Sequence, residues 1–425
     1  MNDYYMRILF IFSLWLMPSI IFAQSEFDDQ VFEDNIQSVR LYPKTAEFSS
    51  QLNSPAIPLH APRPLVLEFD DIAYEPDRYS ATIIHCNSDW TPSGLKSADY
   101  INQYNEFNLN EYEYSINTRV PYIHFTFQLP AVTKSGNYVV KVYRGRNEDE
   151  VILVRRFVVY NNQVNVGASV VPPNNTADRK TSQQINLNIN YSERDLVDPV
   201  TNVKVVIRQN QRWDNAIVGL KPTFIRDDRS VLEYKPFDGS NVFNGGNEFR
   251  FVDLRYTRTK GQNIASVKIE EDVVYAETTL DQPRTHQAYL EYLDLNGQYG
   301  IFTYDKPNHE LESEYVLITF NLKSDPLPQA PFVLGAMSNW GNNPDAQMAY
   351  DKDLKVYKAT LLLKQGWYDY QYGLKTPGGF VLKEIEGEHF QTENEYEILV
   401  YYREMGSRYD ELIGYSVLNP NKRRL

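Results

Sequence analysis

The residue types that could do chemistry gather in one short stretch, ATIIHCNSDWTPSGL, from Ala81 to Leu95. It holds the single cysteine of the chain, Cys86, directly after His85 and three residues before Asp89. A thiol beside a histidine base, with a carboxylate to orient that base, is the equipment of a cysteine nucleophile. The stretch therefore raises the hypothesis of a hydrolase that uses Cys86.

The local pattern argues against this hypothesis. Residues 79–86 alternate as a strand does, and adjacent side chains of a strand point to opposite faces, so Cys86 cannot meet His85. We expect Cys86 to pack beside Ile84 on the inward face, because free cysteine behaves as a small apolar residue. Other histidines could approach Cys86 in space, but the sequence singles out none of them: His60, His124, His286, His309 and His389.

Other catalytic or phosphate-binding patterns are weaker still. There is no Gly-x-Ser-x-Gly elbow, and with 56 acidic residues a chance pair of carboxylates carries no information. Residues 239–247 are rich in glycine and asparagine, but residues 248–251 read as a strand, whereas a phosphate loop needs a following helix. We predict no catalytic residue, no cofactor and no enzyme activity.

A calcium site is the remaining candidate, at residues 294–297 (Asp-Leu-Asn-Gly). The carboxylate spacing of an EF-hand loop is absent, so we assign no metal. Asn296-Gly297 instead predicts a type I′ hairpin turn between strands at 289–293 and 299–304.

Composition indicates an all-β protein. The chain has 425 residues, enough for roughly two to four domains, and its 32 tyrosines favour strands. The net charge of -14 argues against nucleic acid as a partner, since such binding depends on clustered Lys and Arg. The longest basic run, at 422–424, is interpreted as a solvated tail.

The first residues indicate export. One basic residue, Arg7, precedes an apolar run that ends at Ile21-Phe22-Ala23, which is the layout of a cleavable signal peptide over residues 1–23. About 15 apolar residues are too few for a membrane-spanning helix, and no later stretch suits direct membrane insertion. An exported chain with one cysteine cannot form an internal disulfide, so its stability must come from core burial.

Turns and proline-rich stretches divide the rest of the chain into tandem antiparallel, immunoglobulin-like β-sandwiches with few short helices. One helix is expected within Leu95–Phe107, where apolar residues recur at helical spacing. The predicted parts are a flexible lead (24–35), an N-terminal sandwich (36–163), a middle sandwich (164–323), a proline-rich linker (324–331) and a C-terminal sandwich (332–425).

The last of these parts resembles the small sandwiches that include glycogen- and starch-binding modules. The resemblance rests on FVLGAMSNWG from Phe332 and GWYDYQYGL from Gly366. In such modules exposed tryptophans stack on sugar rings, so Trp340 and Trp367 are the candidate partner-binding residues. Large aromatic residues of small sandwiches are more often core, which makes a glycan an unlikely partner.

A wider resemblance runs from about residue 36 to the C-terminus. The segments that carry it are IIHCNSDWTPSGL from Ile83, YEYSINTRVPYIHFTF from Tyr112, SGNYVVKVYR from Ser135, RRFVVY from Arg155, GGNEFR from Gly245 and TENEYEILVYYREMGSRYDELIGY from Thr392. In this combination and order they are similar to the type IX secretion system plug protein family of Bacteroidota.

This resemblance implies a non-enzymatic periplasmic protein whose partner is the large outer-membrane translocon barrel. After signal-peptide cleavage it would occupy the periplasmic opening of the barrel and seal it sterically. Tyrosine-rich sandwiches suit such a role, because tyrosine supplies large contact area at low entropic cost. The alternative is an exported glycan-binding protein that uses Trp340 and Trp367.

Overall fold

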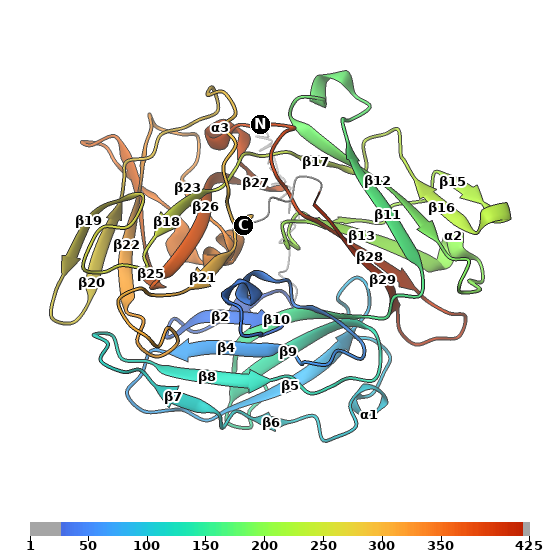
Figure 1. Cartoon of the computed structure of the whole chain (residues 1–425), viewed down its shortest axis with the longest axis horizontal. Coiled ribbons are helices and arrows are strands. Elements are labelled where there is room, and N and C mark those ends of the chain that lie inside the picture. The colour runs from blue at the N-terminus through green and yellow to red at the C-terminus, as the bar shows by residue number, and fades with distance from the viewer. Residues whose placement is uncertain (1–26, 420–425) are drawn as a thin grey trace, which may run out of the picture.

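Three β-sandwiches, each built from two sheets, make up residues 27–419, which are the part of the chain that the computed structural model describes. Figure 1 shows them around a common centre, with the blue and teal N-terminal sandwich below, the green and red one to the right, and the yellow and orange one to the left. The predicted all-β class is confirmed. The predicted signal peptide lies outside the described residues.

The first sandwich follows the chain closely. One sheet contains β1 (Gln30–Val31), β3 (Ala56–Pro58), β5 (Tyr79–Cys86), β6 (Phe107–Asn108), β9 (Gly136–Arg144) and β10 (Val151–Tyr160). The other contains β2 (Ile36–Tyr42), β4 (Val66–Asp71), β7 (Tyr112–Tyr114) and β8 (Ile123–Gln128). Apolar side chains at alternate positions of both sheets fill the core between them.

The second sandwich takes strands from two distant parts of the sequence. One sheet contains β11 (Asn165–Val171), β12 (Ser182–Asn190), β15 (Phe224–Arg226), β16 (Val231–Tyr234) and β17 (Val242–Asn244). The other contains β13 (Val203–Gln209), β14 (Ile217–Val218), β28 (Tyr396–Tyr402) and β29 (Glu411–Leu418). The last two strands of the chain thus complete the middle sandwich.

The third sandwich is formed by the residues between these two parts. One group of strands comprises β18 (Arg250–Asp253), β21 (Tyr299–Ile301), β23 (Pro331–Leu334), β26 (Gly366–Thr376) and β27 (Gly379–Val381). The facing sheet comprises β19 (Ile264–Ile269), β20 (Val274–Thr278), β22 (Tyr315–Lys323), β24 (Ala349–Asp351) and β25 (Val356–Lys364). Both sheets contribute to one apolar core.

Strand pairing crosses the boundaries that the sequence suggested at 323 and 332. The proline-rich stretch joins β22 to β23, which lie in the two sheets of one sandwich, and Leu327 there packs against their common core. Residues 332–425 do not form one sandwich, because β28 pairs with β13 along its full length. This pairing buries Ile398 and Val400 in the core of the second sandwich.

Residues 27–35 of the expected flexible lead are ordered. β1 pairs with β10, and Phe27 is buried. The pairing covers part of the β10 edge, and unpaired sheet edges are unfavourable.

Helices are few and short. The helix expected within Leu95–Phe107 is limited to α1 (Ser97–Tyr100), because the side chain of Asn105 bonds both backbone groups of Ile83 and holds the following residues along β5. The others are α2 (Pro199–Asn202), α3 (Lys383–Glu386) and the 3-10 turns η1 (Phe48–Leu52), η2 (Thr176–Asp178), η3 (Asp227–Arg229), η4 (Ala336–Gly341) and η5 (Pro344–Ala346). Within residues 27–419 no helix is long and apolar enough to cross a membrane.

The turn at Asn296-Gly297 forms, but the hairpin does not. Both residues have positive φ, 53° and 79°, as a type I′ turn requires. Residues 289–293 are not a strand, however. The backbone N–H groups of Leu295 and Gly297 instead donate to the carboxylate of Asp369, which ties the turn to β26.

Candidate functional site

The cysteine cluster is not a nucleophile site. Cys86 is fully buried at the end of β5, and burial raises the pKa of its thiol to about 12. The ring of His85 lies on the opposite face, where Nε2 is 3.2 Å from the carbonyl oxygen of Ser135. Burial lowers the pKa of His85 to about 4. Both groups are therefore neutral at physiological pH.

The predicted burial of Cys86 is confirmed, but its expected direction is wrong. Cys86 points away from the core of the first sandwich, into an apolar cluster with Leu399, Tyr401 and Leu412 of the second sandwich. Among the described residues its sulfur contacts one hydrogen-bonding group, the carbonyl of Ile84 at 3.9 Å. The outer face of the β5 sheet is buried because the second sandwich covers it.

The joint between the first and second sandwiches also includes the segment Ser88-Asp89-Trp90, which follows Cys86. Ser88 donates from its backbone and hydroxyl to the buried carboxylate of Asp410, at 3.0 and 2.7 Å. Lys204 and Arg403 reach the same carboxylate at 3.0 and 2.7 Å. Burial opposes ionisation, but the hydrogen bonds from Ser88 and Lys204 lower the pKa of Asp410. The segment is thus an interface element.

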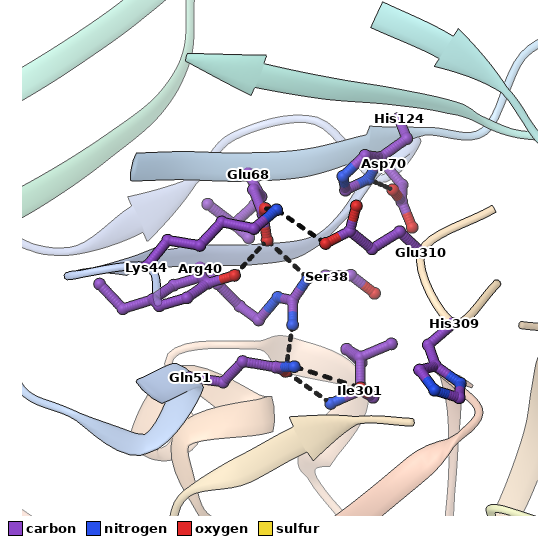
Figure 2. Close-up of polar contacts among 12 residues, drawn as sticks. Ser38, Arg40, Lys44, Gln51, Glu68, Asp70, His124, Ile301, His309 and Glu310 are labelled. Atoms are coloured by element: carbon purple, nitrogen blue, oxygen red, sulfur yellow. Dashed lines mark hydrogen bonds and ion pairs between the residues drawn. The ribbon is translucent and has the colours of Figure 1, made fainter. Parts of the chain in front are cut away.

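The joint between the first and third sandwiches is ionic, as Figure 2 shows. Glu68 on β4 is fully buried and accepts hydrogen bonds from Arg40 at 2.8 Å, Tyr42 at 2.8 Å and Lys44 at 2.6 Å. Lys44 also reaches Glu310 of the third sandwich at 2.7 Å. Burial would raise the pKa of Glu68, but Arg40 and the other nearby cations lower it to about 2.

A second buried carboxylate lies beside the first. Asp70 on β4 accepts from Lys364 Nζ and Tyr315 Oη of the third sandwich, each at 2.6 Å. His124 Nδ1 of β8 lies 2.6 Å from its other oxygen. Burial opposes ionisation, but Lys364 and His124 hold the pKa of Asp70 well below its ordinary value. The negative charge of the first sandwich is thus neutralised by a cation of the third.

Amide side chains hold together the two chain segments that cross between the second and third sandwiches. Asn210 and Asn394 are both buried, and their side chains bond at 2.7 Å. Asn394 also donates to the carbonyl of Gly245 and to the side chain of Gln183, at 2.8 and 3.1 Å. Buried polar groups that are satisfied in this way fix the path of the two crossing segments.

Sequence reasoning missed these joints. Glu68 and Asp70 stand at alternate positions of a strand that also contains the apolar residues Val66, Leu67 and Phe69, and Asn394 lies in a polar stretch before a buried strand. Acidic residues on a buried strand are a signal that could have been used, because buried carboxylates require cationic or hydrogen-bonding partners. The partners of Asp70 in the third sandwich, Tyr315 and Lys364, lie 245 and 294 residues away in the sequence and carry no local signal.

The two candidate tryptophans do not present free rings. The guanidinium of Arg212 covers Trp340 at 4.3 Å from the ring centre. Trp367 on β26 stacks on Phe251 with ring centres 4.3 Å apart, and its Nε1 donates to Asp369 at 3.0 Å. Both side chains are half-buried. A role of these residues in partner binding stays a prediction.

Two groups of side chains have the composition of a divalent-cation site. In each group the potential ligand atoms lie within 4.8 Å of one another. The groups are Glu68 with His124 and Glu310, and Glu248 with Asp294 and Glu393. In the first, the ammonium of Lys44 already bridges the two glutamates, so the position of a cation is taken. In the second, burial and the nearby Asp369 raise the pKa of Asp294.

Comparison with known proteins adds a family to this geometry. Residues 36–161, which span the first sandwich from β2 through β10, match the family model described as the type 9 secretion system plug protein 1st domain. A crystal structure of a hypothetical protein from Parabacteroides merdae is 30% identical to the chain, with a TM-score of 0.85 over 93% of this chain and 100% of that one. No curated protein matches.

Proposed function

Because this chain belongs to the type 9 secretion system plug protein family, through the match of its residues 36–161, we propose that it is a periplasmic plug of the outer-membrane translocon barrel. In this role it occupies the periplasmic opening of the barrel and blocks it while no cargo passes. The family match is the observation that carries the proposal. The function is steric and requires no catalysis.

The architecture supports a steric role. A plug must keep its shape against a wide pore, so its parts must not hinge. Here the second and third sandwiches each join the first through buried contacts, and the chain crosses twice between the second and third sandwiches, where a buried amide side chain bonds the two crossing segments to each other. The three bodies close on one another around a common centre (Figure 1). Interfaces whose buried polar groups are hydrogen-bonded suppress the relative motion that separate domains otherwise show.

The partner is tested by affinity purification. Tagged protein, expressed from its own signal sequence, is recovered from detergent-solubilised outer membranes and its companions are identified. We expect a very large barrel subunit in the eluate and the mature protein in the periplasmic fraction of unlysed cells. A tagged periplasmic protein of similar acidity, prepared in parallel, controls for non-specific capture. Recovery without any large barrel would refute the proposal.

Sealing is tested separately from binding. The purified barrel, reconstituted in a planar bilayer, should conduct when alone and close after the protein is added to the periplasmic side. A variant in which Lys364→Met weakens the joint between the first and third sandwiches should bind but seal less completely. If the protein binds the barrel and leaves its conductance unchanged, the role is in assembly rather than in sealing.

The alternative, glycan binding, makes a different prediction. It requires that the native protein be retarded in gels containing soluble glucan, and that Trp340→Ala and Trp367→Ala abolish this effect without unfolding. Since protein groups cover a face of each ring, we expect no retardation.

A further inference from the structure

A cavity of about 350 Å³ lies where the three sandwiches meet, and each of them contributes to its wall. Arg155 belongs to the first sandwich, Trp213 follows β13 of the second, and Trp340 and Asn342 come from η4 and its end in the third. Cavities between domains that combine aromatic and polar side chains are common ligand sites. The question is which ligand chemistry this wall would accept.

Four arginines line the cavity, and three of them are neutralised by carboxylates. The pairs are Arg40 with Glu68 at 2.8 Å, Arg156 with Asp28 at 2.6 Å, and Arg208 with Glu397 at 2.9 Å. Two of these guanidinium groups also stack on tryptophan rings, Arg156 on Trp90 at 4.4 Å and Arg208 on Trp213 at 4.3 Å. These arginines are structural.

Arg155 differs from the other three. Among residues 27–419 its side chain makes one hydrogen bond, from Nη1 to the carbonyl oxygen of the preceding residue, Val154, at 3.0 Å. Within the same residues no carboxylate lies at ion-pair distance from it. The nearest acidic influence is Asp29, whose carboxylate accepts the backbone N–H of Arg156 at 2.6 Å. Burial accordingly lowers the pKa of Arg155, and Asp29 offsets this only in part.

The donors of Arg155 therefore remain available to a ligand. A guanidinium carries five N–H donors in a planar fork that matches a carboxylate or a phosphate. Three acids line the wall: Asp28, which pairs with Arg156, Asp29 and Asp214. Asp214 accepts from Nε and Nη2 of Arg212, at 3.0 and 2.6 Å, so it does not compete. The exposed amide of Asn342 stands at the same cavity as a further donor.

We propose that the cavity at the junction of the three sandwiches binds a small ligand bearing an oxyanion, a phosphate or a carboxylate group, through Arg155. The volume exceeds that of the anion alone, so it leaves room for an organic part of the ligand beside Trp213 and Trp340. Because every sandwich lines the site, a bound ligand contacts all three bodies at once. This inference does not depend on the proposed plugging role.

Titration calorimetry and thermal unfolding of the full mature chain test the proposal, with inorganic phosphate and malonate as probes at constant ionic strength. We expect saturable binding of at least one probe, with a Kd of about 1 mM. The unfolding temperature should rise with the concentration of that probe. Binding of phosphate alone assigns a phosphate group, and binding of malonate alone assigns a carboxylate. No saturable binding of either probe would overturn the proposal.

The matched variants are Arg155→Gln and Arg146→Gln, which remove the same charge. The side chain of Arg146 is 85% exposed between β9 and β10, where its Nε lies 3.7 Å from Glu106, and it does not line the cavity. Arg155→Gln should weaken binding at least about tenfold, whereas Arg146→Gln should leave it within about twofold. Equal weakening by both variants would mean a non-specific charge effect and would refute the site.

A second measurement excludes a purely structural role for Arg155. Without ligand, Arg155→Gln should unfold at the same temperature as the wild type or higher. The substitution removes a positive charge that forms no ion pair with a carboxylate among the described residues. A clear loss of stability without ligand would show that Arg155 serves the fold, and would overturn the assignment.

Discussion

The ionic joint between the first and third sandwiches predicts a large and specific loss of stability for Lys364→Met. Lys364 is 1% exposed, and its ammonium contacts the carboxylate of Asp70 at 2.6 Å and the carbonyl of Glu310 at 2.7 Å. It also lies 3.9 Å from the ring centre of Tyr122. Methionine keeps the length of the side chain, so the variant removes the charge and its donors and leaves the packing nearly intact.

The magnitude follows from what remains around Asp70. Removing one partner of a buried ion pair costs about 3–5 kcal/mol, because the other charge stays buried. Here His124 and Tyr315 still donate to Asp70, so we expect the lower end, about 3 kcal/mol. Lys44→Met is the matched control. Its side chain is 34% exposed and Glu68 keeps Arg40 and Tyr42, so its cost should be about 1 kcal/mol.

The assay is urea unfolding followed by tryptophan fluorescence, with the slope checked for each variant. Asp70→Asn alone should also cost about 3 kcal/mol, because it leaves the ammonium of Lys364 buried. The double variant Asp70→Asn with Lys364→Met should cost clearly less than the sum, by at least about 1.5 kcal/mol. If the two changes add within about 0.5 kcal/mol, the pair does not couple the sandwiches and the reasoning is refuted.

Three further predictions concern the residues that the sequence brought forward. Native protein should react with a thiol reagent at Cys86 only as fast as it unfolds, since the thiol is buried and has a pKa of about 12. Rapid labelling of the native protein would contradict this. His85 has a folded pKa of about 4 against an ordinary 6.5, so the unfolded state binds the extra proton and stability falls as pH drops from 7 to 4. The loss should be up to about 3 kcal/mol and should largely disappear in His85→Gln; an unchanged slope would show that another group titrates. Trp367→Ala should lower stability by about 3 kcal/mol through the lost stack on Phe251, and a fully stable variant would show that the ring is not part of the packing.

Local pattern predicted the strands well where one face of a strand is apolar. The bounds expected for β5, residues 79–86, match the structure, because alternation over eight residues specifies a strand. The expected strand at 289–293 does not form. The hydroxyls of Tyr289 and Tyr292 in this segment instead donate to Glu248, which precedes β18. Side chains of distant elements decided this segment.

The sequence by itself determined the strand content, the burial of Cys86, the separation of Cys86 from His85 and the family. These are properties of periodicity and of residue type, which act over a few neighbouring positions. Tertiary structure alone decided that β28 and β29 close the second sandwich, that the second sandwich covers the outer face of β5, and that Asp70 meets Lys364, 294 residues away. Such pairings depend on which apolar surfaces and which buried charges still lack a partner after the local elements have formed. A short segment of sequence contains no information about that.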